Sequence, residues 1–129
     1  MNLTFVASWI AIGFLSGVSI FQLAIMAGAP LGEYAFGGQN KGKLPRNLRI
    51  GSAITTVLYL ALIGHFLGQI GLLPRLLDSQ LNSVANWAVV GLFSIALIMN
   101  TITRSKKERA IWAPVSLVLL AASIVIALG

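Results

Sequence analysis

The chain has 129 residues, of which 57% are hydrophobic and 9% charged, with a formal net charge of +6. Soluble domains carry about 25% charged residues, so this composition excludes an ordinary water-soluble fold and indicates one domain, residues 1–129, embedded in lipid. The absence of cysteine excludes disulfides and thiolate chemistry. With three acidic residues and one histidine, the sequence gives no basis for assigning catalytic residues, a metal site or a cofactor.

Four apolar stretches free of Asp, Glu, Lys and Arg predict four transmembrane helices, over about residues 3–27, 50–73, 87–102 and 110–128. A spanning helix needs roughly 20 apolar residues, and in lipid it must satisfy its own backbone hydrogen bonds. We therefore predict an all-α membrane protein, a four-transmembrane-helix bundle. Between the second and third stretches, residues 72–81 are expected to form a short interfacial helix.

Each of the first two predicted helices contains a pair of glycines four residues apart, Gly13 and Gly17 in the first helix and Gly64 and Gly68 in the second. Small residues at this spacing let helix backbones approach closely. We interpret these glycines as helix-packing positions. The spacing leaves open whether they form a dimer face or pack inside the bundle.

The first loop begins Gly-Ala-Pro-Leu-Gly-Glu at Gly28 and is rich in glycine, yet it retains apolar and aromatic residues. Pro30 should end the first helix nearby. We expect the loop to fold against the mouth of the bundle, as a structural cap or a gate. Glu33 is then expected to pair with Arg49 or Arg109.

His65, the only histidine, lies within the second predicted helix. An ionisable side chain inside a membrane is a functional candidate by default. Two interpretations stay open: a ligand-binding residue, or a neutral histidine that hydrogen-bonds to a neighbouring helix.

Polar residues at helical spacing form stripes on two helices. They are Ser16, Ser19 and Gln22 on the first helix, and Ser52, Thr55, Thr56 and Tyr59 on the second. The stripes either hold helices together by interhelical hydrogen bonds or line a cavity open to the cytoplasm, formed by Gln22, Thr56, Tyr59 and Asn100. These four residues, with Glu33 and His65, are the candidate ligand-binding residues.

Eight of the nine Lys and Arg residues lie in two loops, residues 28–49 and 103–109. The positive-inside rule places these loops in the cytoplasm and both termini outside. Topology accounts for the charge, so we expect no nucleic-acid partner. The second loop can also contact anionic lipid headgroups, through Arg104, Lys106, Lys107 and Arg109.

The first and third helices share a pattern at a constant offset of 78 residues: Trp9, Gly13 and Ser16 match Trp87, Gly91 and Ser94, and Gln22 then matches Asn100. This pattern predicts two helical-hairpin repeats in parallel orientation, as in some transporters. Chance similarity between apolar helices is the alternative.

Two segments carry a resemblance: Gly-Ala-Pro-Leu-Gly-Glu from Gly28, followed by Gly-Gly-Gln from Gly37, and Arg-Ser-Lys-Lys-Glu-Arg-Ala-Ile-Trp-Ala-Pro-Val from Arg104. With them the chain resembles an uncharacterised family of small bacterial integral membrane proteins with four transmembrane helices. The resemblance implies a bacterial inner membrane and no particular activity. Small multidrug transporters fit less well, because they carry a carboxylate inside the first helix.

These features predict a non-enzymatic membrane protein that binds or transports a small molecule as a homo-oligomer. One alternative is an accessory or scaffolding subunit of another membrane protein. A further alternative is a membrane enzyme that uses His65 on a lipid-derived substrate.

Overall fold

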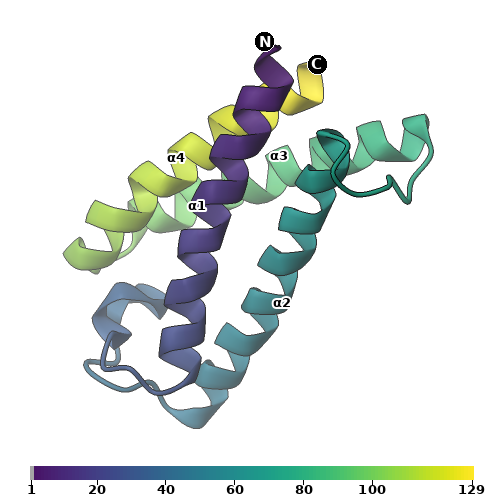
Figure 1. The fold of residues 1–129 in the computed structure, drawn as a ribbon. Coiled ribbons are helices and arrows are strands. Elements are labelled where there is room, and N and C mark those ends of the chain that lie inside the picture. Colours follow the sequence, from purple (N-terminus) through teal and green to yellow (C-terminus); the bar gives the residue numbers. More distant parts are fainter. Residues whose placement is uncertain (1) are drawn as a thin grey trace.

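The computed structural model describes residues 2–129. Within that range the regular secondary structure consists of helices alone. Four long helices follow one another along the chain: α1 (Leu3–Met26), α2 (Arg46–Gln69), α3 (Ser79–Ile102) and α4 (Lys106–Leu128). Two short 3₁₀ helices, η1 (Gly32–Tyr34) and η2 (Phe36–Gly38), lie in the first loop. Each long helix is long and apolar enough to cross a membrane, which confirms the predicted fold class (Figure 1).

Three of the four long helices begin before the apolar stretches that the sequence indicated, and α2 ends at Gln69, earlier than the predicted residue 73. α3 begins at Ser79 instead of residue 87, because the side chain of Asp78 caps it by accepting a hydrogen bond from the Leu81 N–H at 2.9 Å. The expected interfacial helix over residues 72–81 was wrong, since most of that segment is irregular and its last residues form the first turn of α3. α2 and α4 each begin four residues early, at Arg46 and Lys106, because polar residues extend a helix beyond its apolar core.

α1 packs along both α2 and α4, and α3 packs along α4, so the helices form two hairpins joined through α1 and α4. α2 and α3 diverge (Figure 1). We call the end that holds residues 27–45 and 103–105 the basic end. The end that holds both chain termini and the α2–α3 loop is the terminal end.

Small side chains bring the helices together in the core. Ala11, Ser8, Ser52 and Ser123 are almost fully buried, and Leu15 and Phe66 fill the space between them. In lipid, helices associate through van der Waals packing and not through hydrophobic collapse, and small residues permit the close approach that this packing needs. The hydrogen bonds described for the polar stripes do not join two helices. The hydroxyls of Thr55, Thr56 and Ser16 each donate to a carbonyl four residues back in their own helix.

The loop between α1 and α2 folds back on the bundle, as the sequence predicted. Ile25, Ala35 and Leu44 form a second small core beneath it. The Gly32 N–H donates to the Gly42 carbonyl at 2.8 Å, and a Cβ on Gly32 would lie 1.9 Å from the Asn40 carbonyl oxygen. Only glycine fits there, and the loop packs over the basic end of the bundle; we call it the cap (residues 27–45).

The two hairpins share features at the offset of 78 residues. Leu15 and Phe93 are both buried, while Trp9 and Trp87 are both exposed. The hydroxyls of Ser16 and Ser94, at 2.7 and 2.8 Å, each donate to the carbonyl four residues back. However, α1 packs along α4 and no contact of that extent joins α2 to α3. The matching burial and hydrogen bonds at this offset agree with an internal duplication, which stays a prediction.

Candidate functional site

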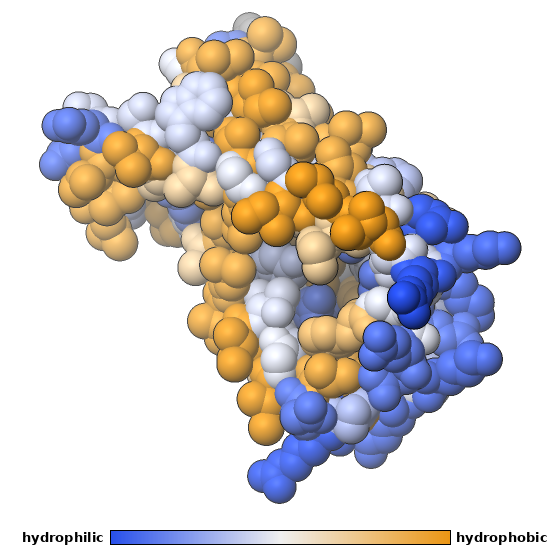
Figure 2. All heavy atoms as spheres, turned by 180° about the vertical axis from the view of Figure 1, so that it is seen from behind, coloured by the Kyte–Doolittle hydropathy of each residue, from blue (hydrophilic) through white to orange (hydrophobic). Residues whose placement is uncertain are grey.

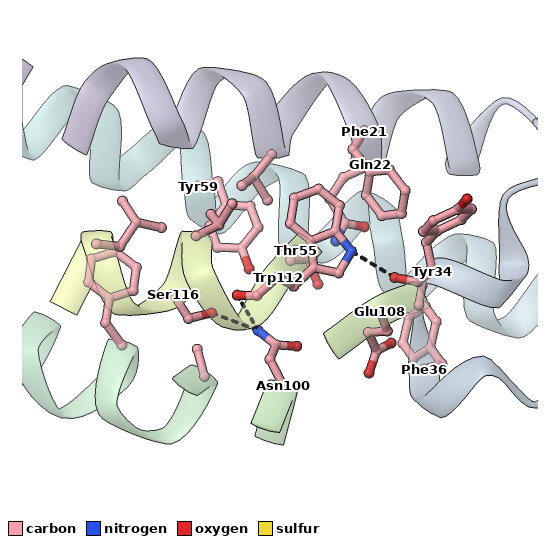
Figure 3. A pocket seen from close by; sticks show the side chains of 16 residues that line it. Phe21, Gln22, Tyr34, Phe36, Thr55, Tyr59, Asn100, Glu108, Trp112 and Ser116 are labelled. Carbon is pink, nitrogen blue, oxygen red and sulfur yellow. Dashed lines mark hydrogen bonds between the residues drawn. The ribbon is translucent and has the colours of Figure 1, made fainter. Parts of the chain in front are cut away.

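A cavity of about 170 Å³ lies at the basic end, between all four helices and the cap (Figure 3). Three predicted site residues line it: Gln22 from α1, Tyr59 from α2 and Asn100 from α3. The rest of its wall consists of Val18, Phe21, Tyr34, Ala35, Phe36, Thr55, Phe93, Ala96, Glu108, Trp112, Val115, Ser116 and Leu119. Residues far apart in the sequence therefore meet at one site.

Asn100 is held in place by α4. Its Nδ2 donates to the Ser116 Oγ at 2.7 Å and to the Trp112 carbonyl at 3.4 Å (Figure 3). Both donor bonds point toward α4, so the Oδ1 of the same amide remains an acceptor for another group.

Gln22 lines the cavity and carries an unpaired acceptor. Its Oε1 is buried and has no hydrogen-bond partner within residues 2–129. A buried polar atom without a partner lowers stability by roughly 1–3 kcal/mol. A bound molecule that supplies a donor would remove that penalty.

Thr56 does not line the cavity, and the neighbouring Thr55 does. Thr56 is buried between helices, where its hydroxyl donates to the Ser52 carbonyl at 2.8 Å. One residue corresponds to a rotation of about 100° around a helix. The prediction therefore had the correct turn of α2, but it was wrong in choosing Thr56 over Thr55.

Glu108 is a cavity residue that the sequence analysis missed, because it counted residues 103–109 as a basic loop. The residue is only 7% exposed. Its backbone N–H is capped by the Ser105 Oγ at 3.1 Å, and its Oε2 accepts a hydrogen bond from the Gly37 N–H at 3.2 Å. The Ser-x-x-Glu spacing of a capping box was the available sign that Glu108 belongs to a helix.

The cap is fastened to the start of α4. The Trp112 Nε1 donates to the Tyr34 carbonyl at 2.7 Å, and the Trp112 ring packs on Phe21 with 4.6 Å between centroids. The Ser105 hydroxyl donates to the Glu33 carbonyl at 2.5 Å. These bonds close the cavity on the side of the basic loops.

Glu33 forms an ion pair with Lys107, so the expected pairing with Arg49 or Arg109 was wrong. The hydrogen bond and charge of Lys107 hold the pKa of the Glu33 carboxyl below its usual value. Arg49 instead donates from Nε to the Met26 carbonyl at 2.9 Å, at the C-terminus of α1. Cations are favoured at that end of a helix by the helix dipole.

Phe36 has a left-handed backbone, with φ of +50°. This conformation is uncommon for a bulky residue and is stored strain. Phe36 lines the cavity where the cap meets α2, and its ring tip lies 3.6 Å from the Cβ position of Gly51. The cap thus carries one strained residue at the edge of the cavity.

His65 lies at the terminal end, away from the cavity. It belongs to a group of paired polar side chains, the terminal ladder, which consists of His65, Gln69, Asn82 and Asn86. The His65 Nε2 and Asn86 Oδ1 are 2.7 Å apart, and Gln69 and Asn82 exchange hydrogen bonds of 2.8 and 2.9 Å. This geometry matches the interpretation of His65 as a histidine bonded to a neighbouring helix.

The partners of His65 were also missed. A sign was present in the sequence, because polar residues recur four apart on each of two neighbouring helices, at 65 and 69 and at 82 and 86. Residues four apart lie on one face of a helix, so two such pairs can meet across an interface.

The glycine pairs do not pack against other helices. A Cβ at Gly13, Gly17 or Gly64 would meet no atom of residues 2–129 within 4 Å. Gly68 is covered by the α2–α3 loop, with the Arg75 Cγ 3.7 Å from its Cβ position. Packing inside the bundle therefore does not explain these glycines. Gly13 and Gly17 are exposed on the outer face of α1.

Residues 2–129 contain no group of three His, Asp or Glu side chains placed to hold a metal ion. No protein-family model matches the chain, and neither the curated proteins nor the solved structures include a significant match.

Proposed function

We propose that this protein binds a small molecule in the basic-end cavity and carries out its function, as a binding protein or transporter, within a bacterial inner membrane. The convergence of Gln22, Tyr59 and Asn100 from three helices on one cavity carries the proposal. Gln22 adds an acceptor that has no partner within residues 2–129 and that a donor of a ligand could satisfy.

The size of the cavity limits the ligand. A closed apolar cavity of about 150 Å³ takes up one benzene molecule. The basic-end cavity, at about 170 Å³, suits a ligand close to the size of a single aromatic ring.

We propose that the cavity opens toward lipid between α2 and α3. α2 and α3 diverge at the basic end, and Figure 2 shows a hollow with hydrophilic colour in its depth and apolar side chains around it. Exposed apolar residues of both helices flank this side, among them Ile54 and Val57 on α2 and Ile95 and Ile98 on α3. We propose that the ligand enters sideways from the membrane, while the cap closes the aqueous side.

The positive-inside rule supports placing the basic end in the cytoplasm and both termini outside. The side chains of Arg104, Lys106, Lys107 and Arg109 are all exposed there. In this orientation they lie at the level of the headgroups and are available to anionic lipids, each contributing about 1 kcal/mol near the surface.

The exposed Gly13 and Gly17 on α1 favour a homo-oligomer, since a second helix can approach their backbone closely. The same face favours the second candidate function, an accessory subunit that packs against another membrane protein. The two candidates differ in the occupant of the cavity: a small molecule for the first, and none for the second.

Native mass spectrometry of the protein extracted in a gentle detergent tests the proposal. A defined non-lipid mass should be retained by the wild type and lost in Ala96→Phe, which fills the cavity. Ala88→Phe on the exposed face of α3 is the matched control and should retain it. A mass that survives Ala96→Phe, or a complex with one other protein and no small ligand, would contradict cavity binding.

A further inference from the structure

We infer that the ligand of the basic-end cavity is a small organic cation, an ammonium group that carries apolar substituents. The inference rests on the proposed function and names its substrate class. It follows from two properties of the cavity wall, its charge and its aromatic residues, and its hydrogen-bonding groups are compatible with it.

The charge of the wall is negative although the protein is strongly positive. Glu108 is the only charged side chain that lines the cavity. The basic side chains next to it in sequence, Lys107 and Arg109 among them, are exposed. Within residues 2–129 the single ion pair joins Lys107 to Glu33, so the Glu108 carboxylate has no cationic partner.

A buried carboxylate without a cation is costly, because burial removes hydration that one backbone N–H does not replace. The one hydrogen bond described for the Glu108 side chain comes from Gly37 at 3.2 Å and reaches Oε2. A cation in the cavity would supply the missing countercharge. An anionic ligand, in contrast, would meet no cationic side chain in the wall and would be repelled by Glu108.

Aromatic residues make up much of the remaining wall. They are Phe21, Tyr34, Phe36, Tyr59, Phe93 and Trp112. Aromatic faces attract ammonium groups through the ring quadrupole, most strongly where water is excluded, and substituted ammonium ligands are bound by aromatic cages for this reason. The Tyr34 ring already has the Lys107 ammonium 5.6 Å from its centroid, on the cap side.

The hydrogen-bonding groups of the wall can both accept and donate, since the Gln22 amide and the Tyr59 and Ser116 hydroxyls carry donors as well as acceptors. The donors of Trp112, Asn100 and Thr55 are already used within the protein. The Gln22 Oε1 is unpaired, and the Asn100 Oδ1 accepts no described hydrogen bond. Figure 3 shows both amides in the same cavity as Glu108. These acceptors can take N–H or O–H donors of a ligand, and its positive charge is favoured by Glu108.

Three probes of one shape test the inference, namely (2-hydroxyethyl)trimethylammonium, its neutral carbon isostere 3,3-dimethylbutan-1-ol, and the anion 3,3-dimethylbutanoate. Binding to the detergent-solubilised protein is measured by calorimetry. The cation should bind at least about tenfold more tightly than the neutral isostere, and the anion most weakly. Equal or tighter binding of the neutral or anionic probe, or no binding of the cation, would overturn the inference.

Glu108→Gln identifies the group responsible. Glutamine keeps an oxygen acceptor for Gly37, and the preference for the cation should fall at least about fivefold in this variant, since its charge partner is gone. Glu33→Gln is the matched control, because this carboxylate lies in the cap and pairs with Lys107 outside the cavity wall, and the preference should persist. An unchanged preference in Glu108→Gln would overturn the assignment, and the wild-type probe series decides the charge class even if this variant does not fold.

The outcomes separate the inference from the proposed function. If Ala96→Phe removes the retained native ligand and that ligand is neutral or anionic, the cavity binds small molecules and only the charge class is wrong. If Ala96→Phe changes neither the retained mass nor the binding of the probes, the cavity itself is not the binding site.

Discussion

The two ends of the α2–α3 pair carry similar polar side chains and use them in opposite ways. At the terminal end, His65 and Gln69 of α2 bond directly to Asn86 and Asn82 of α3. At the basic end, Tyr59 of α2 and Asn100 of α3 line a cavity and make no hydrogen bond to each other.

Helix separation causes the difference. Where α2 and α3 meet, amides and imidazole reach one another and satisfy their own donors and acceptors, which lipid cannot do. Where the helices diverge, the same kinds of side chain are too far apart to pair, and the cap and α4 complete the wall instead (Figure 1). The polar groups of the terminal ladder thus hold α2 and α3 together, and those of the basic end line a cavity.

The largest effect is expected at the cap. Trp112→Ala removes the packing on Phe21 and the hydrogen bond to the Tyr34 carbonyl, so the free energy of unfolding should fall by about 3 kcal/mol. Trp87→Ala at the other end, where the ring is 47% exposed, should change it by no more than about 0.5 kcal/mol. Unfolding in mixed detergent measures both. Equal losses would show that the cap does not depend on Trp112.

A smaller effect is expected in the terminal ladder. A double-mutant cycle of His65→Ala and Asn86→Ala should give a coupling of about 0.6 kcal/mol and no more than about 1.7, the range for hydrogen bonds between transmembrane helices. The matched cycle at the basic end, Tyr59→Phe with Asn100→Ala, should give none, because no bond joins those side chains. Coupling of similar size at both ends would show that Tyr59 and Asn100 interact as His65 and Asn86 do.

The smallest effect concerns pH at the cap. Because the pKa of Glu33 is lowered from its ordinary 4.5, the ion pair with Lys107 stabilises the cap above that value and is lost as the pH falls through the lowered pKa. In a Trp9→Phe, Trp87→Phe background, the fluorescence of Trp112 should begin to change below about pH 4.5. Glu33→Gln should remove that change. A titration that survives this substitution would assign it to another group.

Much of the fold could be predicted from residue type alone. Long apolar stretches without charge can only be helices in lipid, and α1 agrees with its predicted range of residues 3–27 to within one residue. The start of α3 could not be found this way, since a cap at Asp78 and the polar residues Asn82 and Asn86 are invisible to a search for apolar residues. Their helical spacing was the signal that hydropathy does not measure.

The candidate site was predicted in part. Polar spacing brought Gln22, Tyr59 and Asn100 into one hypothesis, because all three lie near the same end of their helices. Glu108 and the choice of Thr55 over Thr56 depend on how far each helix is rotated about its own axis. That rotation is set by packing against neighbouring helices. It cannot be predicted for helices that are apolar on nearly every face, because their sequences do not distinguish the buried face from the lipid-facing one.

Local composition and spacing are enough to predict the lipid environment, the class of fold and the gathering of positive charge in two loops. Packing in three dimensions was needed to show that Glu33 pairs with Lys107 and with neither Arg49 nor Arg109, that His65 is bonded to α3, and that Glu108 lines the cavity. These outcomes depend on the divergence of α2 from α3 and on the path of the cap. Both are set by close packing between residues remote in sequence, which no single segment of the chain encodes.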